Sequence, residues 1–467
     1  MNRETYTYST RMPVPVDQAF DWHERTGAFE RLTPPWVTMD VLERHGLGIT
    51  DGVTLKMRIN YGPIHTTWTV RHKDYVKNKQ FVDYQIEGPM AFYEQRHGFA
   101  AESNTSSVLE DTVIFQLPAG MAGELVANMV VHEEFTRLFQ YRHQIVQDDL
   151  RCANRYKGEK AMKIAVAGAS GFVGSALIPF FTTQGHEVRR LVRPNSHHKG
   201  VEIGETANWD PDKNEIDEAA LEGCDAVVNL AGDNIGTGRW DDEKKRRMQS
   251  SRINSTKLLC NRMRQMKNPP KVLVNASAIG YYGDRPGETM TEQSSHGKGY
   301  LADLCQDWEN AAKSAEQMGV RTVFGRIGVV LSPAGGALQK MLMPFQMGAG
   351  GPIGSGEQQF SWIALDDLLG AILHCLASDS LSGPVNFTAP NPVSNGEYSR
   401  ALGKVLQRPA FMPMPAFAAR MAFGQFADEC LLSSTRVIPE KLQQTNYEFR
   451  YPQLEGALRH VLGRREG

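Results

Sequence analysis

The chain has 467 residues, 41% of them hydrophobic, which is enough for two or three domains with cores of ordinary size. Its 51 basic and 53 acidic residues nearly cancel and form no long run of one sign. This argues against a nucleic-acid surface or a polybasic membrane anchor, and leaves a small molecule as the expected partner.

The first residues contain no apolar stretch, and no window of the sequence approaches the ~18 apolar residues of a membrane helix. We therefore expect no signal peptide, no membrane span and a cytoplasmic location.

Residues 1–150 alternate between apolar and polar side chains in four segments, which predicts half-buried strands at 53–60, 64–70, 81–86 and 109–117. Tyr61-Gly-Pro63 supplies a turn between the first two strands.

Two helices are expected beside these strands. One lies around Ala19–Trp22, and a longer one follows Pro118, where apolar residues from Leu125 to Tyr141 recur near a 3.6-residue period. One antiparallel sheet closed by one long helix can enclose a cavity. Residues 1–150 are therefore predicted to form an α+β ligand-pocket domain.

The order of these elements resembles that of START-like (polyketide-cyclase-like) helix-grip domains. Four short segments add to the resemblance: Leu32-Thr-Pro-Pro-Trp36, Glu87-Gly-Pro89, Arg96-His97 and Phe139-Gln-Tyr-Arg142. The resemblance implies an apolar ligand held between sheet and helix, with His97 and Arg142 as candidates to contact its polar end. The alternative is that both side chains lie at the surface or make ordinary hydrogen bonds.

A polar stretch at 151–161 is predicted to be a linker. The segment that begins at Met162 resembles the start of an independent protein, so a gene fusion is the simple explanation.

Lys163–Ala167 is a short apolar strand, and the glycine-rich loop Gly168-Ala-Ser-Gly-Phe-Val-Gly174 follows it. A helix comes next, in which Pro179 should cause a kink or be absorbed near the first turns.

The G-x-x-G-x-x-G spacing between a strand and a helix indicates a dinucleotide site. The first glycine allows a sharp turn, the second lets the backbone approach the pyrophosphate, and the third lets helix and sheet pack closely. Bare amides and the positive end of the helix then face the phosphates. We assign cofactor contacts to Gly168, Ser170, Gly171, Phe172, Val173 and Gly174.

The end of the second strand, Glu187–Val192, favours NADP over NAD. An NAD site would place an acidic residue there for the ribose 2′-hydroxyl, whereas this chain has Arg193, which can pair with a 2′-phosphate. Arg190, on the same strand, is expected to point to solvent. The next strand, Ala226–Leu230, runs into Ala231-Gly232, where small residues would let the nicotinamide half of the cofactor lie across the strand end.

Together with the glycine-rich loop, nine further motifs resemble the epimerase-family (NAD-dependent epimerase/dehydratase-like) branch of the extended short-chain dehydrogenase/reductases. They are Asn229-Leu-Ala-Gly232, Arg239-Trp240, Ser251-Arg252, Ser277-Ala-Ile-Gly-Tyr-Tyr-Gly283, Trp308-Glu309, Arg326-Ile-Gly-Val-Val-Leu331, Gly350-Gly-Pro-Ile-Gly-Ser-Gly356, Ser361-Trp362-Ile363 and Asp366-Asp367. The resemblance covers essentially Met162 to the C-terminus, and fusion to a START-like domain is similar to longer members of the branch.

This resemblance implies an α/β fold with a doubly wound, parallel Rossmann sheet at 162–407 and a small C-terminal helical domain at 408–467. It also implies cofactor contacts from Val192, Arg193, Leu230, Ala231 and Arg252, and we assign Gly232, at the same strand end, to the cofactor as well. Arg252 would place a cation near phosphate. The alternative for Arg252 is a salt bridge on the surface of a helix.

Short-chain dehydrogenases usually work with a serine, a tyrosine, and a lysine four residues after the tyrosine. Ser277, just after the strand Lys271–Asn275, and Tyr300, at the start of a helix, are the catalytic candidates. The lysine position holds Leu304, so the ammonium that should lower the tyrosine pKa is missing from that helix face.

Other groups are candidates for parts of this chemistry. Arg252 is a candidate electrostatic substitute for the lysine, Tyr281 and Tyr282 are alternative acid–base groups, and Lys298 is expected to lie off the tyrosine's helix face. Ser277 and Tyr300 could also merely line the pocket. The glycine-rich stretch at 348–356 is expected to form a pocket wall, and the methionines before it suit either an apolar substrate or core packing.

Three functions remain open. The first is an NADP-dependent oxidoreductase or epimerase acting on an unidentified small molecule. The second is a non-catalytic NADP-binding sensor or scaffold, which Leu304 favours, and the third is a ligand carrier that works through residues 1–150. A homodimer formed through helices is common among relatives, but no residue here demonstrates one. Six scattered cysteines without a C-x-x-C pair predict free thiols, and no metal site is supported.

Overall fold

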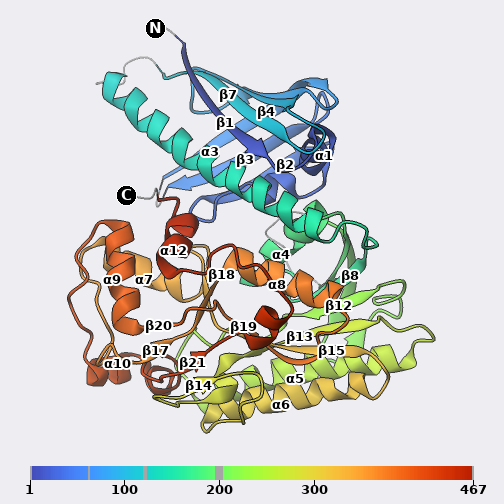
Figure 1. Ribbon diagram of the computed structural model, residues 1–467, viewed down its shortest axis with the longest axis vertical. Coiled ribbons are helices and arrows are strands. Elements are labelled where there is room, and N and C mark those ends of the chain that lie inside the picture. The colour runs from blue at the N-terminus through green and yellow to red at the C-terminus, as the bar shows by residue number, and fades with distance from the viewer. Residues whose placement is uncertain (1–2, 62–63, 119–123, 195–202, 465–467) are drawn as a thin grey trace. The chain divides into compact units, whose positions relative to one another are not determined.

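The computed structural model describes residues 3–61, 64–118, 124–194 and 203–464. Contacts within the chain divide it into two units, one built mainly on residues 1–159 and the other on 160–467, with residues 178–185 grouped with the first. In Figure 1 the chain runs from blue through teal in the first unit and from green to red in the second.

The first unit contains one antiparallel sheet of seven strands in the order β1-β7-β6-β5-β4-β3-β2. Strands β2 to β7 form a meander, and β1 pairs with β7 from Glu4 opposite Phe115 to Met12 opposite Ser107. The strands are β1 (Glu4–Met12), β2 (Thr38–His45), β3 (Thr54–Tyr61), β4 (Ile64–Val76), β5 (Gln80–Glu87), β6 (Phe92–Ala101) and β7 (Ser107–Gln116).

The four predicted strands correspond to β3, β4, β5 and β7. In β7 the alternation is complete, since Leu109, Asp111, Val113 and Phe115 are all buried. β1, β2 and β6 were not predicted. In β1 the inward positions include Tyr6, Tyr8 and Thr10, whose polar tips weaken the hydrophobic signal. The predicted turn after Tyr61 lies outside the described residues.

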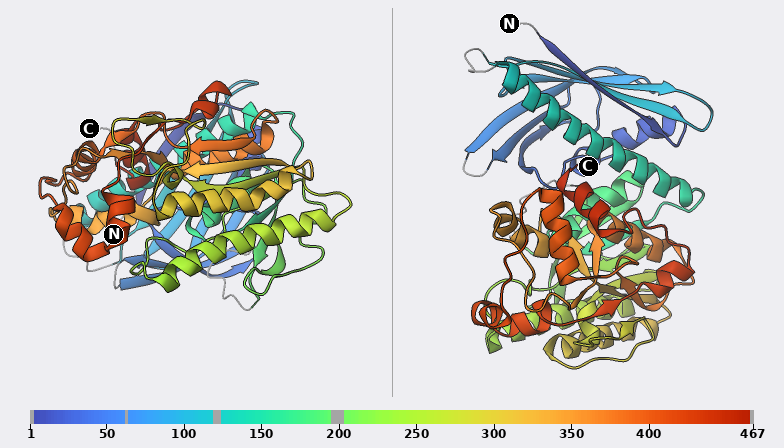
Figure 2. Two further views of the ribbon diagram at one scale, coloured as in Figure 1. Left: turned by 90° about the horizontal axis from the view of Figure 1, so that it is seen from below. Right: turned by 60° about the vertical axis from the view of Figure 1, so that its left-hand side comes forward.

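Three helices complete the first unit: α1 (Val16–Glu24), α2 (Ala28–Arg31) and α3 (Glu124–Arg155). Helix α3 lies along the sheet (Figures 1 and 2) and buries Phe139, Ile145 and Leu150 among the apolar side chains of the unit. The predicted linker at 151–161 starts too early, because α3 continues to Arg155 before the chain leaves helix and strand.

The second unit contains an eight-stranded sheet in the order β11-β10-β9-β8-β12-β13-β15-β19. All neighbours are parallel except β11, which pairs antiparallel with β10. The strands are β8 (Lys163–Ala167), β9 (Glu187–Val192), β10 (Glu205–Asp210), β11 (Glu215–Ile216), β12 (Ala226–Asn229), β13 (Val272–Ala278), β15 (Arg321–Ile327) and β19 (Gly383–Phe387).

The strand order reverses between β8 and β12, which confirms the predicted doubly wound Rossmann sheet. In such sheets the ligand crevice lies at the carboxyl ends of the strands where the order reverses. Residues 164–167 of β8 and all four residues of β12 are buried, as expected for strands covered on both faces. Ser277 lies inside β13, which extends to Ala278, and not after the strand as predicted.

Helices connect and cover these strands: α4 (Phe172–Thr183), α5 (Asp242–Gln265), α6 (Tyr300–Glu316), α7 (Gly336–Gln346), α8 (Leu365–Ala377), α9 (Asn395–Leu406), α10 (Ala416–Phe423), α11 (Glu440–Gln444) and α12 (Leu454–Leu462). Helices α5 and α6 lie side by side along the sheet (Figures 1 and 2) and bury Leu259 and Ala312 against Leu273 and Phe324. Pro179 does not end α4, which continues to Thr183.

Short paired strands lie outside the main sheet: β14 (Thr289–Met290) with β21 (Arg436–Val437), β16 (Val329–Leu331) with β18 (Trp362–Ala364), and β17 (Gln359–Phe360) with β20 (Val393–Ser394). Leu458 and Val461 of α12 share one buried cluster with Leu402 and Val405 of α9. The described residues after 407 are therefore packed with the rest of the second unit.

No helix among the described residues is both long and apolar enough to cross a bilayer.

Candidate functional site

The glycine-rich loop between β8 and α4 has no room for side chains at two of its glycines. Gly168 has a φ of 78°, and a Cβ there would lie 2.7 Å from the Leu230 carbonyl carbon. A Cβ on Gly174 would overlap the Gly168 carbonyl oxygen. Ser170 and Gly171 are exposed, while Phe172 and Val173 are half-buried at the start of α4. This close approach of bare backbone to a helix N-terminus fits a dinucleotide pyrophosphate.

The residue predicted to contact a ribose 2′-phosphate lies at the end of β9. Arg193 follows Val192 directly, and its Nη2 lies 3.1 Å from Asp212 Oδ2, with both side chains about half exposed. A guanidinium at this strand end is suited to a phosphate. The prediction for Arg190 was wrong, because that side chain is buried and does not point to solvent.

Beyond β12, a buried amide network fixes the backbone that would meet the nicotinamide half of a dinucleotide. Asn229 Nδ2 donates to Asn275 Oδ1 at 2.7 Å, and Asn229 Oδ1 accepts from the Ala231 amide at 3.2 Å. The Leu230 amide donates to Ala167 O at 2.9 Å. Sequence reasoning gave Asn229 no role. The sequence feature that could have indicated a role is that Asn229 is a polar residue at the end of an apolar strand.

Arg252 of α5 lies directly against the end of this segment. A Cβ on Gly232 would lie 3.1 Å from the Arg252 guanidinium carbon, and that carbon is 5.0 Å from the centre of the Trp308 ring. Its Nη1 donates to Met248 O at 2.9 Å. Burial lowers the pKa of Arg252 from its ordinary value, and the side chain remains a cation. Within the part of the chain that the structure describes, Arg252 makes no surface salt bridge, which was the alternative prediction.

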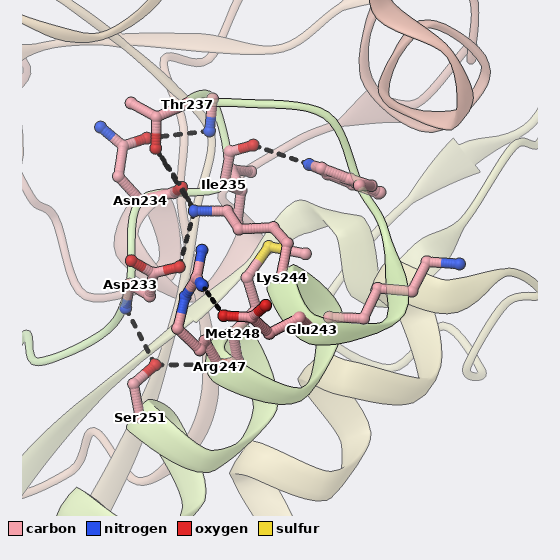
Figure 3. A network of polar contacts seen from close by, with 12 residues as sticks. Asp233, Asn234, Ile235, Thr237, Glu243, Lys244, Arg247, Met248 and Ser251 are labelled. Atoms are coloured by element: carbon pink, nitrogen blue, oxygen red, sulfur yellow. Dashed lines mark hydrogen bonds and ion pairs between the residues drawn. The ribbon is translucent and has the colours of Figure 1, made fainter.

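The loop from Asp233 to Asp241 is held by one buried lysine (Figure 3). Lys244 Nζ lies 2.6 Å from Asp233 Oδ2 and 2.6 Å from Asn234 O, and its side chain is 5% exposed. The Asp233 amide donates to Ser251 Oγ at 2.9 Å. This loop, which continues from Gly232, is therefore anchored to α5 through Lys244 and Ser251.

The hydroxyl of Ser277 is already used inside the protein. Ser277 is 2% exposed, and its Oγ donates to Glu309 Oε1 at 2.8 Å. Glu309 also pairs with Arg326 through two hydrogen bonds of 2.8 and 2.9 Å. Ser277 thus donates to the carboxylate of a buried ion pair. Sequence reasoning missed this arrangement because Ser277 and Arg326 lie 32 and 17 residues from Glu309 along the chain.

Tyr300 is directed toward α5. Its hydroxyl donates to Lys245 O at 2.9 Å, and the Lys245 ammonium lies 5.3 Å from the centre of its ring. Burial raises the pKa of Tyr300, and the nearby charge of Arg252 offsets this in part. The structure therefore gives Tyr300 neither the lowered pKa nor the free hydroxyl of an acid–base tyrosine.

The face of α6 beside Ser277 carries other residues. A Cβ on Gly280, which follows Ser277 closely, would lie 3.2 Å from Leu301 Cβ and 3.8 Å from Cys305 Sγ. Leu301 and Cys305 are one helical turn apart, the spacing of a tyrosine–lysine pair. Burial raises the pKa of Cys305 to about 11, so its thiol is neutral at physiological pH.

The alternative tyrosines are also occupied. Tyr282 is fully buried, donates to Asn386 Oδ1 at 2.6 Å and accepts from Arg326 Nη1 at 3.0 Å. Burial raises its pKa to about 12. The Tyr281 ring centre lies 3.5 Å from the Arg326 guanidinium carbon, and Lys298 is exposed. Tyr281 and Tyr282 therefore both contact the Arg326 guanidinium that pairs with Glu309.

In the first unit, His97 and Arg142 are placed differently from each other. His97 is buried on β6, with Nδ1 2.6 Å from Asp111 Oδ1 and Nε2 3.3 Å from Asp83 Oδ2. Arg142 is half-buried on α3, and its Nε donates to Leu32 O at 3.2 Å. Both therefore make internal hydrogen bonds, as the alternative prediction held.

The chain of buried polar groups extends to both sides of His97. His143 Nε2 lies 2.6 Å from Asp111 Oδ2, and Gln95 Nε2 donates to Asp111 Oδ1 at 2.9 Å. His72 Nδ1 lies 2.5 Å from Asp83 Oδ1. Among the described residues, no three or more of the His, Cys, Asp and Glu side chains are arranged to hold a metal ion. None of the six cysteines, all of which lie among the described residues, forms a disulfide.

Family models and curated relatives match the second unit. Residues 164–387 match the NAD dependent epimerase/dehydratase family, and residues 414–461 match a domain of unknown function, DUF1731. The epimerase family protein Mb2239 of Mycobacterium bovis is 42% identical over 301 residues, which cover 64% of this chain and 98% of that protein. The human epimerase family protein SDR39U1 is 35% identical over 64% of this chain and all of its own length.

Solved structures extend the similarity to the first unit. A structure described as the nucleoside-diphosphate sugar epimerase from Corynebacterium glutamicum is 30% identical and covers 98% of this chain and 90% of its own, with a TM-score of 0.78. Human SDR39U1, solved with NADPH, is 34% identical and covers 64% of this chain and 99% of its own, with a TM-score of 0.58.

Proposed function

The chain belongs to the NAD dependent epimerase/dehydratase family, and from this we propose that its second unit binds NADP(H) and acts as an oxidoreductase on a small molecule. The observation that carries the proposal is the loop before α4, in which Gly168 and Gly174 leave no space for a Cβ. The residues that would hold the pyrophosphate are those of the loop from Gly168 to Gly174.

The preference for NADP over NAD rests on Arg193. No acidic residue ends β9, and Arg193, which follows it, forms an ion pair with the exposed Asp212. A ribose 2′-phosphate would compete with this weak surface pair. The solved human relative was crystallised with NADPH, which is consistent with the same preference here.

Arg252 is the residue we assign to the nicotinamide half of the site. It brings a half-buried cation to Gly232, where the backbone after β12 is fixed by Asn229. In this position Arg252 supplies the charge that a lysine four residues after a tyrosine would otherwise provide. When bound, NADP(H) supplies or accepts a hydride at its nicotinamide ring.

A second candidate function is a non-catalytic NADP(H) sensor. It is favoured by the α6 face beside Ser277, which carries Leu301 and Cys305 where a tyrosine–lysine pair would lie. It is also favoured by Ser277, whose hydroxyl is engaged by Glu309. Consumption of NADPH with any small-molecule substrate would exclude this candidate.

The cofactor assignment is tested by titrating the full chain with NADPH and NADH and following nicotinamide fluorescence. Arg193→Ala should weaken NADPH binding by about tenfold or more and leave NADH binding unchanged, because only the phosphate contact is lost. Arg420→Ala, at an ion pair of similar exposure elsewhere in the unit, is the matched control. Absence of binding by either nucleotide would refute the proposal.

For the first unit, we propose a START-like domain that binds an apolar ligand between α3 and the sheet. A seven-stranded antiparallel sheet with one long helix supports this, as do the separate apolar clusters around Phe99, Phe139 and Met57 on the inner side. Native mass spectrometry of the full chain should detect a bound apolar molecule that Phe139→Trp displaces. A ligand-free chain that also takes up no added fatty acid or sterol would refute it.

A further inference from the structure

The apolar side chains on the inner face of the first unit's sheet form separate clusters. Two of them, around Phe99 and Phe139, contain residues of α3. The third combines side chains of β2, β3 and β4 with two from α2 and the segment before β2, and among the described residues none comes from α3. We call the part of this cluster on β3 and β4 the β3–β4 wall: Leu55, Met57, Ile59, Trp68 and Val70.

A row of polar side chains runs across the inner face from the β3–β4 wall to α3. It begins at His72, which shares a face with Val70 because side chains alternate along a strand. His72 Nδ1 lies 2.5 Å from Asp83 Oδ1, and Asp83 Oδ2 lies 3.3 Å from His97 Nε2. The row continues through Asp111 to His143 of α3, by contacts of 2.6 Å each. We call it the His–Asp row: His72, Asp83, His97, Asp111 and His143.

Asp83 determines which nitrogen of His72 carries the hydrogen. Burial alone would raise the pKa of Asp83, but hydrogen bonds with His72 and His97 outweigh burial and hold that pKa below its ordinary value. An ionised carboxylate only accepts hydrogen bonds, so the hydrogen between the two side chains belongs to His72 Nδ1. In the neutral imidazole the other nitrogen, Nε2, is then an acceptor.

The two ends of the His–Asp row differ in access. At the α3 end, the His143 and Asp111 side chains are 2% and 4% exposed, and His143 Nδ1 lies 2.9 Å from Thr10 Oγ1. At the end beside the β3–β4 wall, the His72 and Asp83 side chains keep 15% and 21% exposure although they lie on the inner face. Within the described part of the chain, His72 Nε2 makes no hydrogen bond. A small molecule can therefore reach this acceptor.

The charges of the row select the polar group of such a molecule. Asp83 and Asp111 are two carboxylates, and His97, which faces both of them, is one imidazolium. The remaining negative charge disfavours a carboxylate ligand. An ammonium would need a free carboxylate oxygen, but His72 and His97 hold both oxygens of Asp83. A neutral hydroxyl needs one acceptor, and His72 Nε2 provides it.

We propose that the first unit binds a neutral apolar molecule that carries a hydroxyl group. The hydroxyl donates to His72 Nε2, and the hydrocarbon lies against the β3–β4 wall, which begins two residues before His72 on the same strand. Asp83 is a positioning residue, because it fixes the hydrogen on His72 Nδ1 and does not contact the ligand. This assignment rests on the proposed function of the first unit as a domain for an apolar ligand, and it adds the ligand's polar group.

Calorimetric titration of the full chain with four probes tests the assignment. Decan-1-ol, decyl methyl ether, decanoate and decylamine share one hydrocarbon chain and differ in the polar end. Decan-1-ol should bind about five- to tenfold more tightly than decyl methyl ether, because only the alcohol donates a hydrogen bond. Decanoate and decylamine should both bind more weakly than the alcohol.

Variants assign this preference to His72. His72→Phe keeps an aromatic ring and removes the acceptor, so the ratio of alcohol to ether affinity should fall to about one. Its affinity for the ether should stay within about twofold of wild type, which also reports that the site is folded. Asp83→Asn should lower the same ratio, because an amide can donate to His72 Nδ1 and leave the hydrogen on Nε2. His45→Phe is the matched control, since His45 is 75% exposed on β2, and it should leave the ratio unchanged.

The outcomes separate this assignment from the proposed function. Equal binding of decan-1-ol and decyl methyl ether by the wild-type chain, or an unchanged ratio in His72→Phe, would overturn the assignment and leave the apolar-ligand domain standing. Tighter binding of decanoate would also overturn it and would assign the ligand's polar end to Arg142. Tighter binding of decylamine would assign that end to the carboxylates. A chain that binds none of the four probes refutes the proposed function of the first unit and this assignment together.

Discussion

His97 Nδ1 lies 2.6 Å from Asp111 Oδ1 inside the first unit, and the opposite ring nitrogen faces Asp83. Both nitrogens must carry hydrogen to serve two carboxylates, so His97 is an imidazolium cation. Burial alone would lower its pKa, but Asp111 and Asp83 outweigh burial and raise the pKa to about 9. The same contacts hold the pKa of Asp111 well below its ordinary value, against the effect of its burial.

This pair makes the stability of the first unit depend on pH. The folded pKa of His97 exceeds the unfolded value of about 6.5, so its contribution is complete below that pH and is lost as pH rises through about 9. Urea unfolding followed by pulse proteolysis, with peptides from β6 and β7 quantified, should give a lower midpoint at pH 9.5 than at pH 7. His97→Gln should remove most of this difference, and an unchanged wild-type midpoint would contradict the assignment.

Asp212 should weaken NADPH binding through its ion pair with Arg193. Asp212→Asn removes a carboxylate that competes with a 2′-phosphate for this guanidinium, so NADPH affinity should rise by about two- to fivefold while NADH affinity stays constant. Asp428→Asn, at an ion pair of comparable exposure, controls for the general loss of a negative charge. An equal rise in affinity for NADPH and NADH would show that Arg193 does not contact the ribose 2′-phosphate.

The buried pair of Glu309 and Arg326 should dominate the stability of the region around Ser277. Arg326→Met leaves a buried carboxylate with Ser277 as its remaining side-chain partner, which should cost about 3–5 kcal/mol of unfolding free energy. Adding Glu309→Leu should recover part of that loss. Urea titration of both variants provides the comparison, and a double variant less stable than the single one would contradict the arrangement.

Tyr300→Phe should affect stability more than cofactor binding. The change removes one hydrogen bond to Lys245 O and should cost about 1 kcal/mol of unfolding free energy. NADPH affinity should remain within about twofold of wild type, because the hydroxyl is directed to α5. A tenfold loss of NADPH affinity would contradict this prediction and show that the Tyr300 hydroxyl contacts the bound cofactor.

The backbone shape of the glycine-rich loop could be predicted from sequence because its requirements are local. The spacing of Gly168, Gly171 and Gly174 between an apolar strand and a helix specifies a backbone shape with little reference to distant residues. The doubly wound sheet followed from the same strand–helix pattern. Long-range partners could not be predicted, such as Asn275 for Asn229 or Glu309 for Ser277.

The helix face at α6 shows how small the decisive differences are. Tyr300 and Leu301 are adjacent in sequence, and adjacent residues of a helix point about 100° apart. The sequence alone could not decide which of the two faces Gly280, because that depends on how α6 packs against α5 and the chain after β13. Arg190 was misplaced for a similar reason, since alternation along β9 does not reveal which of its faces is covered.

The bond from Ser277 to Glu309 has a consequence for how natural variants of this protein would appear. In an enzyme with an active serine, replacing it leaves a folded but inactive protein. Here the hydroxyl satisfies a buried carboxylate, so its loss falls on the folded state itself. A natural variant that lacks this hydroxyl would be degraded more readily by cellular quality control, so the amount of protein in the cell would fall. The molecules that remain folded would still bind the nucleotide.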